Sequence, residues 1–360
     1  MNKLKFSDYR YRMGVSGLFK KCTFKDFKEN VQRLKDAGVK TIGVDMYVLL
    51  HKFCLDADVV EVLAYHPEQY HSKMYERIKN YLLDFINLGF DLFLVYDGNR
   101  MKYKITEEDR ARARIANYMK GNLAGSIEVV PKQMFNFQHY IEELNIPFVV
   151  APFEADAQLA YLFKRRIIQC VLTNDSDLII YGVTKIIFIR QKGLDLYEHE
   201  KIDEKAEEES INQMNLEKLW LFGYMIGCDY FKGIPQLGVM KAFKIIAQLK
   251  LVYENTKIDW ESTIKLLATI PDYMKATKKI MHLLPENTLE NAAEKVRMVF
   301  HSQPVFDPMT YELKYLNDTP VLEKDRESFG IVHDNIKVGK GIIDPSNGKE
   351  YQLDGVDMNN

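Results

Sequence analysis

The sequence predicts an α/β fold with a mainly parallel central sheet that carries helices on both faces. From residue 14 to about residue 192, short apolar segments alternate with amphipathic helical segments. Such βαβ alternation is typical of parallel sheets, because a crossover helix must return the chain to the start of the next strand. After residue 210 the pattern is helical, which predicts an additional helical region.

The expected strands are short, and most of them end beside an acidic residue. They lie at 41–44, 92–96, 147–150, 167–172 and 185–190, with 193–197 as a hairpin partner of the last. The expected helices have apolar residues three or four positions apart. They cover 24–37, 74–88, 133–144, 155–165, 216–226, 239–248, 260–267 and 291–300.

Length and composition are those of a large globular protein. Of the 360 residues, 47% are hydrophobic and 28% are charged, and the net charge is −2, which by itself does not favour nucleic acid. No apolar run approaches the roughly eighteen residues of a membrane span, and the first twelve residues lack the apolar segment of a secretory signal. The four cysteines are far apart, so we expect reduced thiols in an intracellular protein.

Seven acidic residues stand where apolar segments end. They are Asp45, Asp97, Glu154, Asp156, Asp175, Asp177 and Asp229. The carboxyl ends of the strands of an open α/β sheet line one crevice, so these acids could meet in one place. Crowded carboxylates raise each other's pKa unless cations neutralise them. Hard divalent ions are the natural ligands, and two of them ~4 Å apart would hold both oxygens of a phosphodiester displacement.

Each of these acids also has a simpler interpretation. An Asp after a strand often forms a turn or caps a helix. The close pairs, Glu154 with Asp156 and Asp175 with Asp177, are harder to explain this way, because like charges two positions apart do not stabilise a turn. The combination therefore predicts a metal site, although the acids alone do not identify its substrate.

Basic residues cluster between positions 100 and 120, a segment that contains seven Lys or Arg residues and only three Asp or Glu residues. A basic stretch beside an acidic metal cleft suits a phosphate polymer. The alternative is a solvated helix face with ordinary ion pairs, such as Asp109 with Arg112.

Six motifs resemble the structure-specific 5′ nuclease family, which includes the flap endonucleases and exonuclease 1. They are Met-Gly-Val-Ser-Gly-Leu at 13–18, Val-Asp-Met-Tyr at 44–47, Val-Tyr-Asp-Gly at 95–98, Ala-Pro-Phe-Glu-Ala-Asp-Ala-Gln at 151–158, Thr-Asn-Asp-Ser-Asp-Leu at 173–178 and Gly-Cys-Asp-Tyr at 227–230. The match runs in order to about residue 308. Leu-Ala-Tyr-Leu at 159–162 and Pro-Val-Phe-Asp-Pro at 304–308 are similar to the exonuclease 1 branch.

The resemblance implies a Mg²⁺-dependent phosphodiesterase that acts on DNA with a 5′ end at a single-strand/double-strand junction. By resemblance, the seven acids bind two Mg²⁺ ions, for which Mn²⁺ can substitute, and Lys104 is the catalytic lysine. The family's arginine falls on Ala111, so Arg110 and Arg112 are both candidates for its role. We expect a 5′-to-3′ exonuclease that also cuts 5′ flaps. The alternatives are a flap endonuclease and a catalytically degenerate scaffold that only binds nucleic acid.

The resemblance also implies a set of DNA contacts and a helix–two-turns–helix element after Asp229, where backbone N–H groups meet phosphate. The implied DNA-binding residues are Gly14, Tyr47, His51, Gly233, Gly238, Lys241 and Lys244. The family's serine ligand for K⁺ falls near Ile226, whose side chain has no oxygen, so K⁺ binding is left open.

By resemblance the chain divides into four segments: an N-terminal extension at 1–12, a nuclease core at 13–230, a helical DNA-binding region at 231–308 and a C-terminal wrap or partly mobile tail at 309–360. A helical arch is expected at about 98–132. Gly121, Gly125 and Pro131 predict that it is low or open, which favours exonuclease activity on recessed ends. A nuclear location and mismatch-repair or clamp proteins as partners are implied by resemblance alone.

Overall fold

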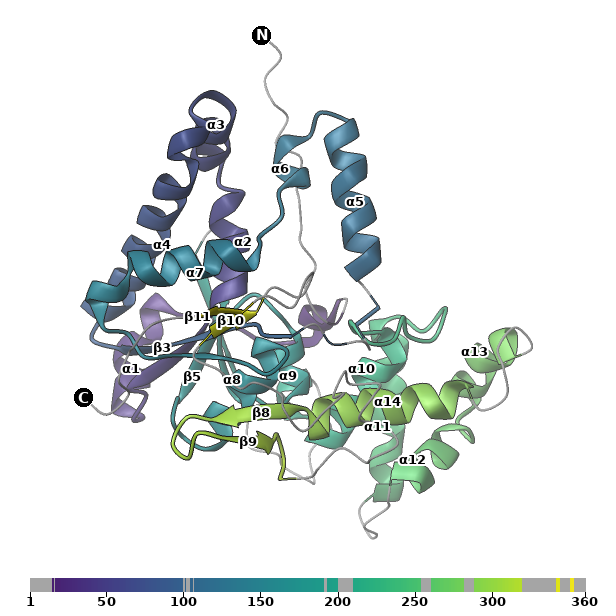
Figure 1. Ribbon diagram of the computed structural model, residues 1–360. Coiled ribbons are helices and arrows are strands. Elements are labelled where there is room, and N and C mark those ends of the chain that lie inside the picture. Colours follow the sequence, from purple (N-terminus) through teal and green to yellow (C-terminus); the bar gives the residue numbers. More distant parts are fainter. Residues whose placement is uncertain are drawn as a thin grey trace.

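A seven-stranded sheet forms the centre of the molecule (Figure 1). The computed structural model describes residues 15, 17–99, 101, 104–105, 107–190, 193–199, 210–253, 260–281, 288–318, 341–343 and 350–352. In spatial order the strands are β1 (Lys25–Asp26), β7 (Leu194–Glu198), β6 (Lys185–Ile189), β5 (Cys170–Thr173), β2 (Thr41–Asp45), β3 (Asp91–Tyr96) and β4 (Phe148–Val150). The five strands from β6 to β4 are parallel, while β7 runs antiparallel to both of its neighbours, β6 and β1. The predicted mainly parallel sheet is therefore confirmed.

Helices cover both faces of this sheet, as predicted. One face carries α2 (Met46–Cys54), α4 (Tyr70–Asn87) and α7 (Pro131–Tyr140), and the other carries α8 (Ala155–Lys164), α9 (Asp177–Ile180) and α10 (Leu216–Ile226). Along β3, Leu92 and Leu94 belong to the first core, and Phe93 and Val95 belong to the second. Because both faces are buried, the strand is apolar from Leu92 to Val95, after the exposed Asp91 at its start.

Two helices between β2 and β3 were not predicted from the sequence, α2 and α3 (Ala57–Tyr65). Six of the nine residues of α2 are buried, so the helix shows little amphipathic periodicity. The helical region after β7 contains α11 (Val239–Tyr253), α12 (Trp260–Leu267), α13 (Pro271–Met281) and α14 (Thr288–Ser302). Of these four helices, α13 was not predicted from the sequence.

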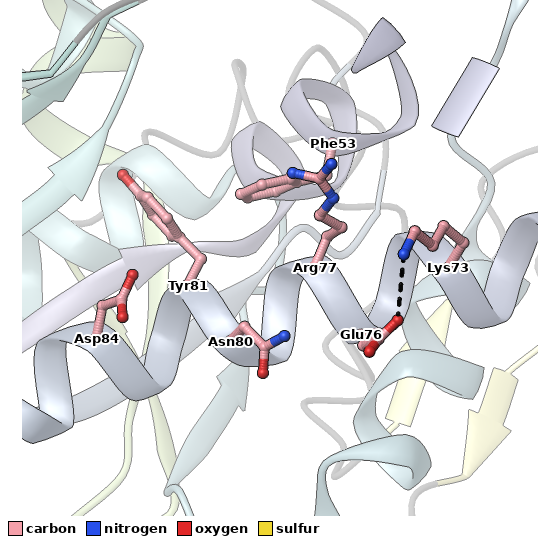
Figure 2. Close-up of a pocket in the computed structure, with 7 residues that line it drawn as sticks. All are labelled: Phe53, Lys73, Glu76, Arg77, Asn80, Tyr81 and Asp84. Atoms are coloured by element: carbon pink, nitrogen blue, oxygen red, sulfur yellow. Dashed lines mark ion pairs between the residues drawn. The ribbon is translucent and has the colours of Figure 1, made fainter. Parts of the chain in front are cut away.

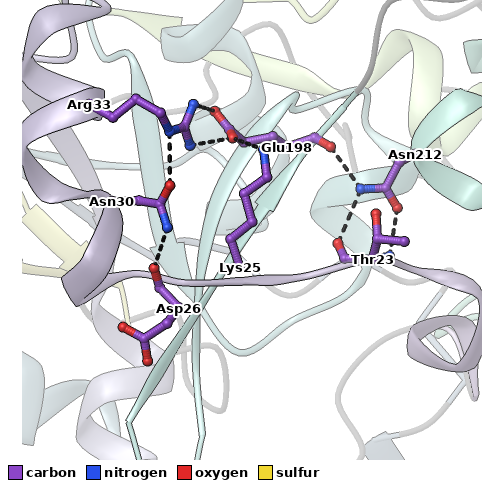
Figure 3. A network of polar contacts seen from close by, with 7 residues as sticks. All are labelled: Thr23, Lys25, Asp26, Asn30, Arg33, Glu198 and Asn212. Carbon is purple, nitrogen blue, oxygen red and sulfur yellow. Dashed lines mark hydrogen bonds and ion pairs between the residues drawn. The ribbon is translucent and has the colours of Figure 1, made fainter.

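The helix expected over 24–37 is largely wrong. Only α1 (Val31–Asp36) is α-helical, and β1 pairs instead with β7. Glu198 on β7 receives Lys25 at 3.0 Å and Arg33 at 2.5 Å, and the Asn212 side chain bonds both backbone groups of Thr23 (Figure 3). These long-range contacts override the local helical pattern.

The expected arch is a pair of helices that stands away from the sheet (Figure 1). It consists of α5 (Glu107–Met119) and α6 (Leu123–Ser126), joined by a bond from Asn117 Nδ2 to the carbonyl of Gly125 at 3.1 Å. Gly121 has φ 70° and lies just beyond α5, but Gly125 is buried inside α6. A thirteen-residue α5 is about 20 Å long. The segment expected to form the arch is therefore helical, and a low or open arch stays a prediction.

The segment after α14 forms a hairpin that packs on α8. The hairpin consists of β8 (Pro304–Asp307) and β9 (Glu312–Tyr315). The buried Gln158 amide both donates to and accepts from the backbone of Phe306, each at 2.7 Å. The short strands β10 (Gly341–Ile343) and β11 (Glu350–Gln352) pair with each other, and β10 contacts α7. Of the predicted C-terminal segment, residues 319–340, 344–349 and 353–360 lie outside the described residues, as does the predicted extension at 1–12.

Among the described helices, none has the length and apolar character needed to cross a membrane. All four cysteines are free, and three of them are buried.

Candidate active site

Four neighbouring parallel strands deliver acids to one edge of the sheet. The contributions are Asp45 at the end of β2, Asp97 after β3, Glu154 and Asp156 after β4, and Asp175 and Asp177 after β5. Asp229 arrives from the turn between α10 and α11. The parallel register places the carboxyl ends of these strands together, so six of the seven acids follow directly from the sheet topology.

Several of these acids also have the simpler structural role. Asp45 caps α2 by accepting from the backbone of Val48 at 3.2 Å, and its second oxygen accepts from Thr173 Oγ1 at 2.9 Å. Asp97 accepts from the backbone of Ala155 at 2.6 Å. The same side chains therefore both cap local structure and belong to the acidic cluster, so the capping role does not exclude a metal-binding role.

Burial and mutual repulsion make ionisation of the cluster unfavourable. Burial, followed by the charge of Asp97, raises the pKa of Asp45 to about 7. Burial, followed by the charge of Asp229, raises the pKa of Asp175 to about 7. Burial and the charge of Asp175 raise the pKa values of both Asp156 and Asp177 well above their usual range. Each of these acids therefore lies within electrostatic reach of at least one other acid of the cluster.

The cluster fits a divalent cation in charge and in donor type. Asp156 Oδ1 and Asp177 Oδ1 are buried and have no hydrogen-bond partner among the described residues, which is costly for a carboxylate unless a positive charge satisfies it. Hard cations such as Mg²⁺ prefer carboxylate oxygens. As the side chains stand, however, no group of three or more His, Cys, Asp or Glu residues in the described chain is arranged to hold a metal ion. Ligation therefore requires these side chains to converge.

Two basic side chains from the arch enter the cluster. Lys104 Nζ forms an ion pair with Glu154 and lies 3.6 Å from Asp229, and Arg110 Nη2 lies 2.9 Å from Asp229 Oδ2. Although burial alone would lower the pKa of Lys104, the carboxylates of Glu154 and Asp229 raise it well above its usual value. The backbone of Ile105 donates to the carbonyl of Asp229 at 2.9 Å, which fastens the base of the arch to the site.

The two candidate arginines have different surroundings. Arg110 lies in the acidic cluster with its side chain 26% exposed. Arg112 is 71% exposed and pairs with Asp109 at 2.9 Å, three positions earlier on α5. The solvated i,i+3 pair weighed for the basic stretch is thus present, and it is Arg110 that faces the acids.

Tyr47 and His51 lie on α2, beside the arch. Their rings are in edge contact with centroids 4.5 Å apart, and the Tyr47 hydroxyl lies 3.4 Å from the carbonyl of Val129. Burial, and then the charges of Arg110 and Arg114, lower the pKa of His51 to about 3. His51 is therefore a neutral imidazole beside the basic face of α5. Gly14 lies outside the described residues.

The turn between α10 and α11 is a tight local loop. Ile234 donates to the carbonyl of Met225 at 2.9 Å. Gly233 has φ 78°, and a Cβ there would lie 2.6 Å from the nitrogen of Gly227, so this position requires glycine. Gln236, although not a glycine, has a left-handed backbone with φ 68°.

The start of α11 separates charge from apolar surface. Lys241 and Lys244 are exposed, whereas Ala242 and Phe243 between them are buried. The Lys241 ammonium lies 3.5 Å from the carbonyl of Gln236. A Cβ on Gly238 would meet open space, so no steric contact requires glycine there.

A separate hollow of about 400 Å³ lies between α2 and α4 (Figure 2). Its lining contains the ion pair of Lys73 with Glu76 at 3.6 Å and none of the clustered acids. It is lined by Phe53, Lys73, Glu76, Arg77, Asn80, Tyr81 and Asp84. We therefore place the active site at the acidic edge of the sheet and not in this hollow.

Some residues that border the cluster were not predicted from the sequence. Thr173 bonds Asp45 and accepts from the backbone of Asp175 at 3.0 Å. Tyr181 and Tyr230 lie close to predicted acids in the sequence, and that proximity could have drawn attention to them. Gln303, which bonds Tyr181, carries no such signal.

Comparison with known proteins agrees with this geometry. The family model of the XPG I-region matches residues 145–229, which contain five of the seven acids. The chain is 29% identical over 333 residues to exonuclease 1 of Danio rerio, a match that covers 86% of this chain and 38% of the relative. It is 28% identical to the DNA damage-inducible protein DIN7 of Saccharomyces cerevisiae, covering 86% and 70%. The chain thus spans well under half of the exonuclease 1 relative.

Solved structures share the fold. The catalytic core of Rad2 in complex with DNA substrate superposes with a TM-score of 0.53 and 19% identity, covering 88% of this chain and 96% of that one. The Holliday junction-resolving enzyme GEN1 with product DNA, Mg²⁺ and Mn²⁺ ions gives 0.50 and 18%, covering 83% and 66%. The resemblance to the structure-specific 5′ nucleases, with exonuclease 1 among the relatives, is therefore confirmed.

Proposed function

We propose that this protein is a divalent-metal-dependent 5′ nuclease that hydrolyses DNA phosphodiesters. It acts as a 5′-to-3′ exonuclease and also cuts 5′ flaps, in DNA repair or replication. The observation that carries the proposal is the buried cluster of carboxylates with Lys104 among them, because burying so many acids together is costly unless cations neutralise them. The names of the relatives and the Mg²⁺ and Mn²⁺ ions in the GEN1 complex support it.

In this proposal the seven acids hold two Mg²⁺ ions, for which Mn²⁺ can substitute. When bound, such ions supply Lewis-acid chemistry at the phosphodiester. Lys104 releases Glu154 as the acids converge, and its ammonium then faces the scissile phosphate, where it stabilises developing negative charge. Arg110 does the same from the first turns of α5, in the role that the sequence left open between Arg110 and Arg112.

Duplex DNA binds away from the cluster in this proposal, on the exposed lysines of α11. Lys241 and Lys244 lie just after the two-turn loop that carries Asp229. Backbone groups at Gly233 and Gly238 line the same turn and face the duplex. Tyr47 and His51 border the single DNA strand that leaves the site. Ile226 offers no side-chain oxygen, so we propose no K⁺ site here. A nuclear location is part of the proposal, and it rests on the likeness to the eukaryotic relatives.

The arch bears on which 5′ ends are accepted. Since α5 has thirteen residues and α6 only four, helix length by itself does not decide for recessed ends, and likeness to exonuclease 1 supports that preference. Initial rates on a recessed 5′ end, a nick, a gap and a 5′ flap would rank the activities. A flap preference of about a hundredfold, ~2.7 kcal/mol by rate arithmetic, would make the flap endonuclease the better description.

The direct test uses a 5′-labelled duplex with a recessed 5′ end and a matched 5′ flap. We expect cleavage in Mg²⁺ and Mn²⁺ and none with a chelator. The matched control is Asp175→Asn, which preserves shape and removes one carboxylate. DNA binding without any cleavage in either metal would instead support the degenerate scaffold.

A further inference from the structure

A layer of buried polar side chains lies directly beneath the acidic cluster. The Tyr181 hydroxyl donates to Gln303 Oε1 at 3.3 Å, and Gln303 Nε2 donates to Met101 Sδ at 3.5 Å. A side-chain hydrogen bond joins Tyr181 to Tyr230. All four residues are buried, Gln303 and Met101 completely. Buried polar groups must satisfy one another, so their geometry is tightly specified.

Tyr181 links the two ends of this layer. It shares a side-chain hydrogen bond with Tyr230 on one side and donates to Gln303 on the other, and Gln303 in turn donates to Met101. The four side chains therefore form one continuous chain of contacts.

The layer connects three segments that carry proposed catalytic groups. Tyr181 follows α9, four positions after Asp177. Tyr230 is adjacent to Asp229, and Met101 precedes Lys104 by three positions. Gln303 follows α14 and lies just before β8, so the final member comes from the C-terminal part of the described chain.

Helix α14 also supports the layer through packing. The Phe300 ring makes edge contacts with Tyr181 at 4.7 Å and with Tyr230 at 5.7 Å between centroids. Both phenol rings are thus held from the same side. The hydroxyl groups then fix how the rings' own segments sit relative to one another.

We propose that Tyr181, Tyr230 and Gln303 are positioning residues that hold Asp177, Asp229 and Lys104 in register for cleavage. The inference rests on the proposed nuclease function. If it holds, Gln303 after α14 contributes to the rate of the chemical step as well as to the stability of the fold. A misplacement of about 1 Å in such a site can slow reaction by about a hundredfold.

The test compares isosteric substitutions in the layer with a matched substitution in a tyrosine pair of the helical region. Tyr181→Phe and Gln303→Met remove hydrogen-bonding atoms while keeping volume. The control is Tyr224→Phe, because Tyr224 is a buried tyrosine whose hydroxyl bonds another tyrosine, Tyr273, at 3.0 Å in the helical region. Single-turnover cleavage in Mg²⁺, the Kd for DNA and the melting temperature are measured for each.

We expect Tyr181→Phe and Gln303→Met each to slow cleavage by roughly ten- to a hundredfold, with DNA affinity unchanged. Tyr224→Phe should lose a similar amount of thermal stability and keep its rate. The double variant should be no slower than the worse single, because both act through one chain of hydrogen bonds. Wild-type rates in the two layer variants, or an equal loss in Tyr224→Phe, would overturn the proposal.

Hydrogen exchange at the arch base separates this inference from the nuclease function. The amides of Lys104 and Ile105 bond to the carbonyls of Met101 and Asp229 at 3.1 and 2.9 Å. Both should exchange faster in Gln303→Met than in wild type or Tyr224→Phe. If wild type cuts no DNA, the nuclease proposal fails and exchange alone decides whether the layer positions these groups. If wild type cuts DNA but exchange is unchanged, the positioning role fails alone.

Discussion

Two groups of basic side chains border the same turn of this protein, and they differ in what surrounds them. Lys104 and Arg110 lie among carboxylates, with side chains 16% and 26% exposed. Lys241 and Lys244 stand exposed on α11, a few residues beyond Asp229. The first pair has exchanged water for acidic partners, while the second keeps its hydration.

This difference separates chemistry from affinity. A desolvated cation beside acids is held in one geometry and interacts strongly with charge that develops next to it. An exposed lysine contributes mainly by releasing counterions from a phosphate backbone, which is sensitive to salt and tolerant of position. Substitutions at the two groups should therefore affect different measured quantities.

The largest effect is expected on the acidic side of the comparison. Asp177→Asn should reduce cleavage below detection and leave the Kd for DNA nearly unchanged, because it removes a carboxylate whose Oδ1 has no hydrogen-bond partner in the described part of the chain. In chelator, the same variant should melt at a higher temperature, since burial and Asp175 make its negative charge unfavourable. Wild-type cleavage in Mg²⁺ would contradict the site assignment.

Lys104→Ala should come next. Loss of one charged donor at the reacting phosphate should slow single-turnover cleavage by about 10²–10³, with a much smaller change in binding. Rates at saturating enzyme would measure this. An unchanged rate would mean that Lys104 serves only to neutralise Glu154 and Asp229.

The arginines offer a comparison within one helix. Arg110→Ala should slow cleavage by about tenfold to a hundredfold, the equivalent of one charged hydrogen bond. Arg112→Ala should stay within about threefold, as an exposed ion pair contributes little. The two variants have the same composition, so any reversal of their order in single-turnover rate would place the wrong arginine at the site.

The smallest effect on the chemical step is expected at α11. Replacing Lys241 and Lys244 by Glu should raise the apparent KM and flatten its dependence on salt, by about one unit of logarithmic slope for each phosphate that is no longer neutralised. The single-turnover rate should be unchanged. Equal affinity of variant and wild type for a long duplex at low salt would remove α11 from the DNA interface.

The sequence predicted the acidic cluster well because the cluster follows mainly from sheet topology. An acid stands at or soon after the end of each of β2, β3, β4 and β5, and parallel neighbours bring these ends together whatever the details of packing. The choice between Arg110 and Arg112 depends on the rotational phase of α5 against the site, which no local pattern encodes. The Gln303 contact joins segments far apart in the chain and had no local signal.

The fold prediction failed where tertiary contacts override local pattern. Residues 25–26 were expected within a helix, yet they pair with β7, where Glu198 also meets Lys25 and Arg33. By contrast, α2 is buried on most sides and shows no clear polar face. The first error arose because a local pattern does not report pairing with a distant strand, and the second because periodicity reports only one-sided burial.

The local closure of the turn around Asp229 has a consequence for the order in which the site is assembled. The contact of Ile234 with Met225 and the mutual approach of Gly227 and Gly233 all fall within ten residues. Loops of that size close in about 10–100 ns.

The remaining acids depend on strand pairing between distant parts of the chain, such as Ile42 with Cys170, which is intrinsically slower. When the complete chain refolds, we therefore expect the Asp229 loop to form before the edge of the sheet that it serves. Pulse-labelled hydrogen exchange should find the Ile234 amide protected earlier than that of Val171. The reverse order would show that the loop forms only on a finished sheet.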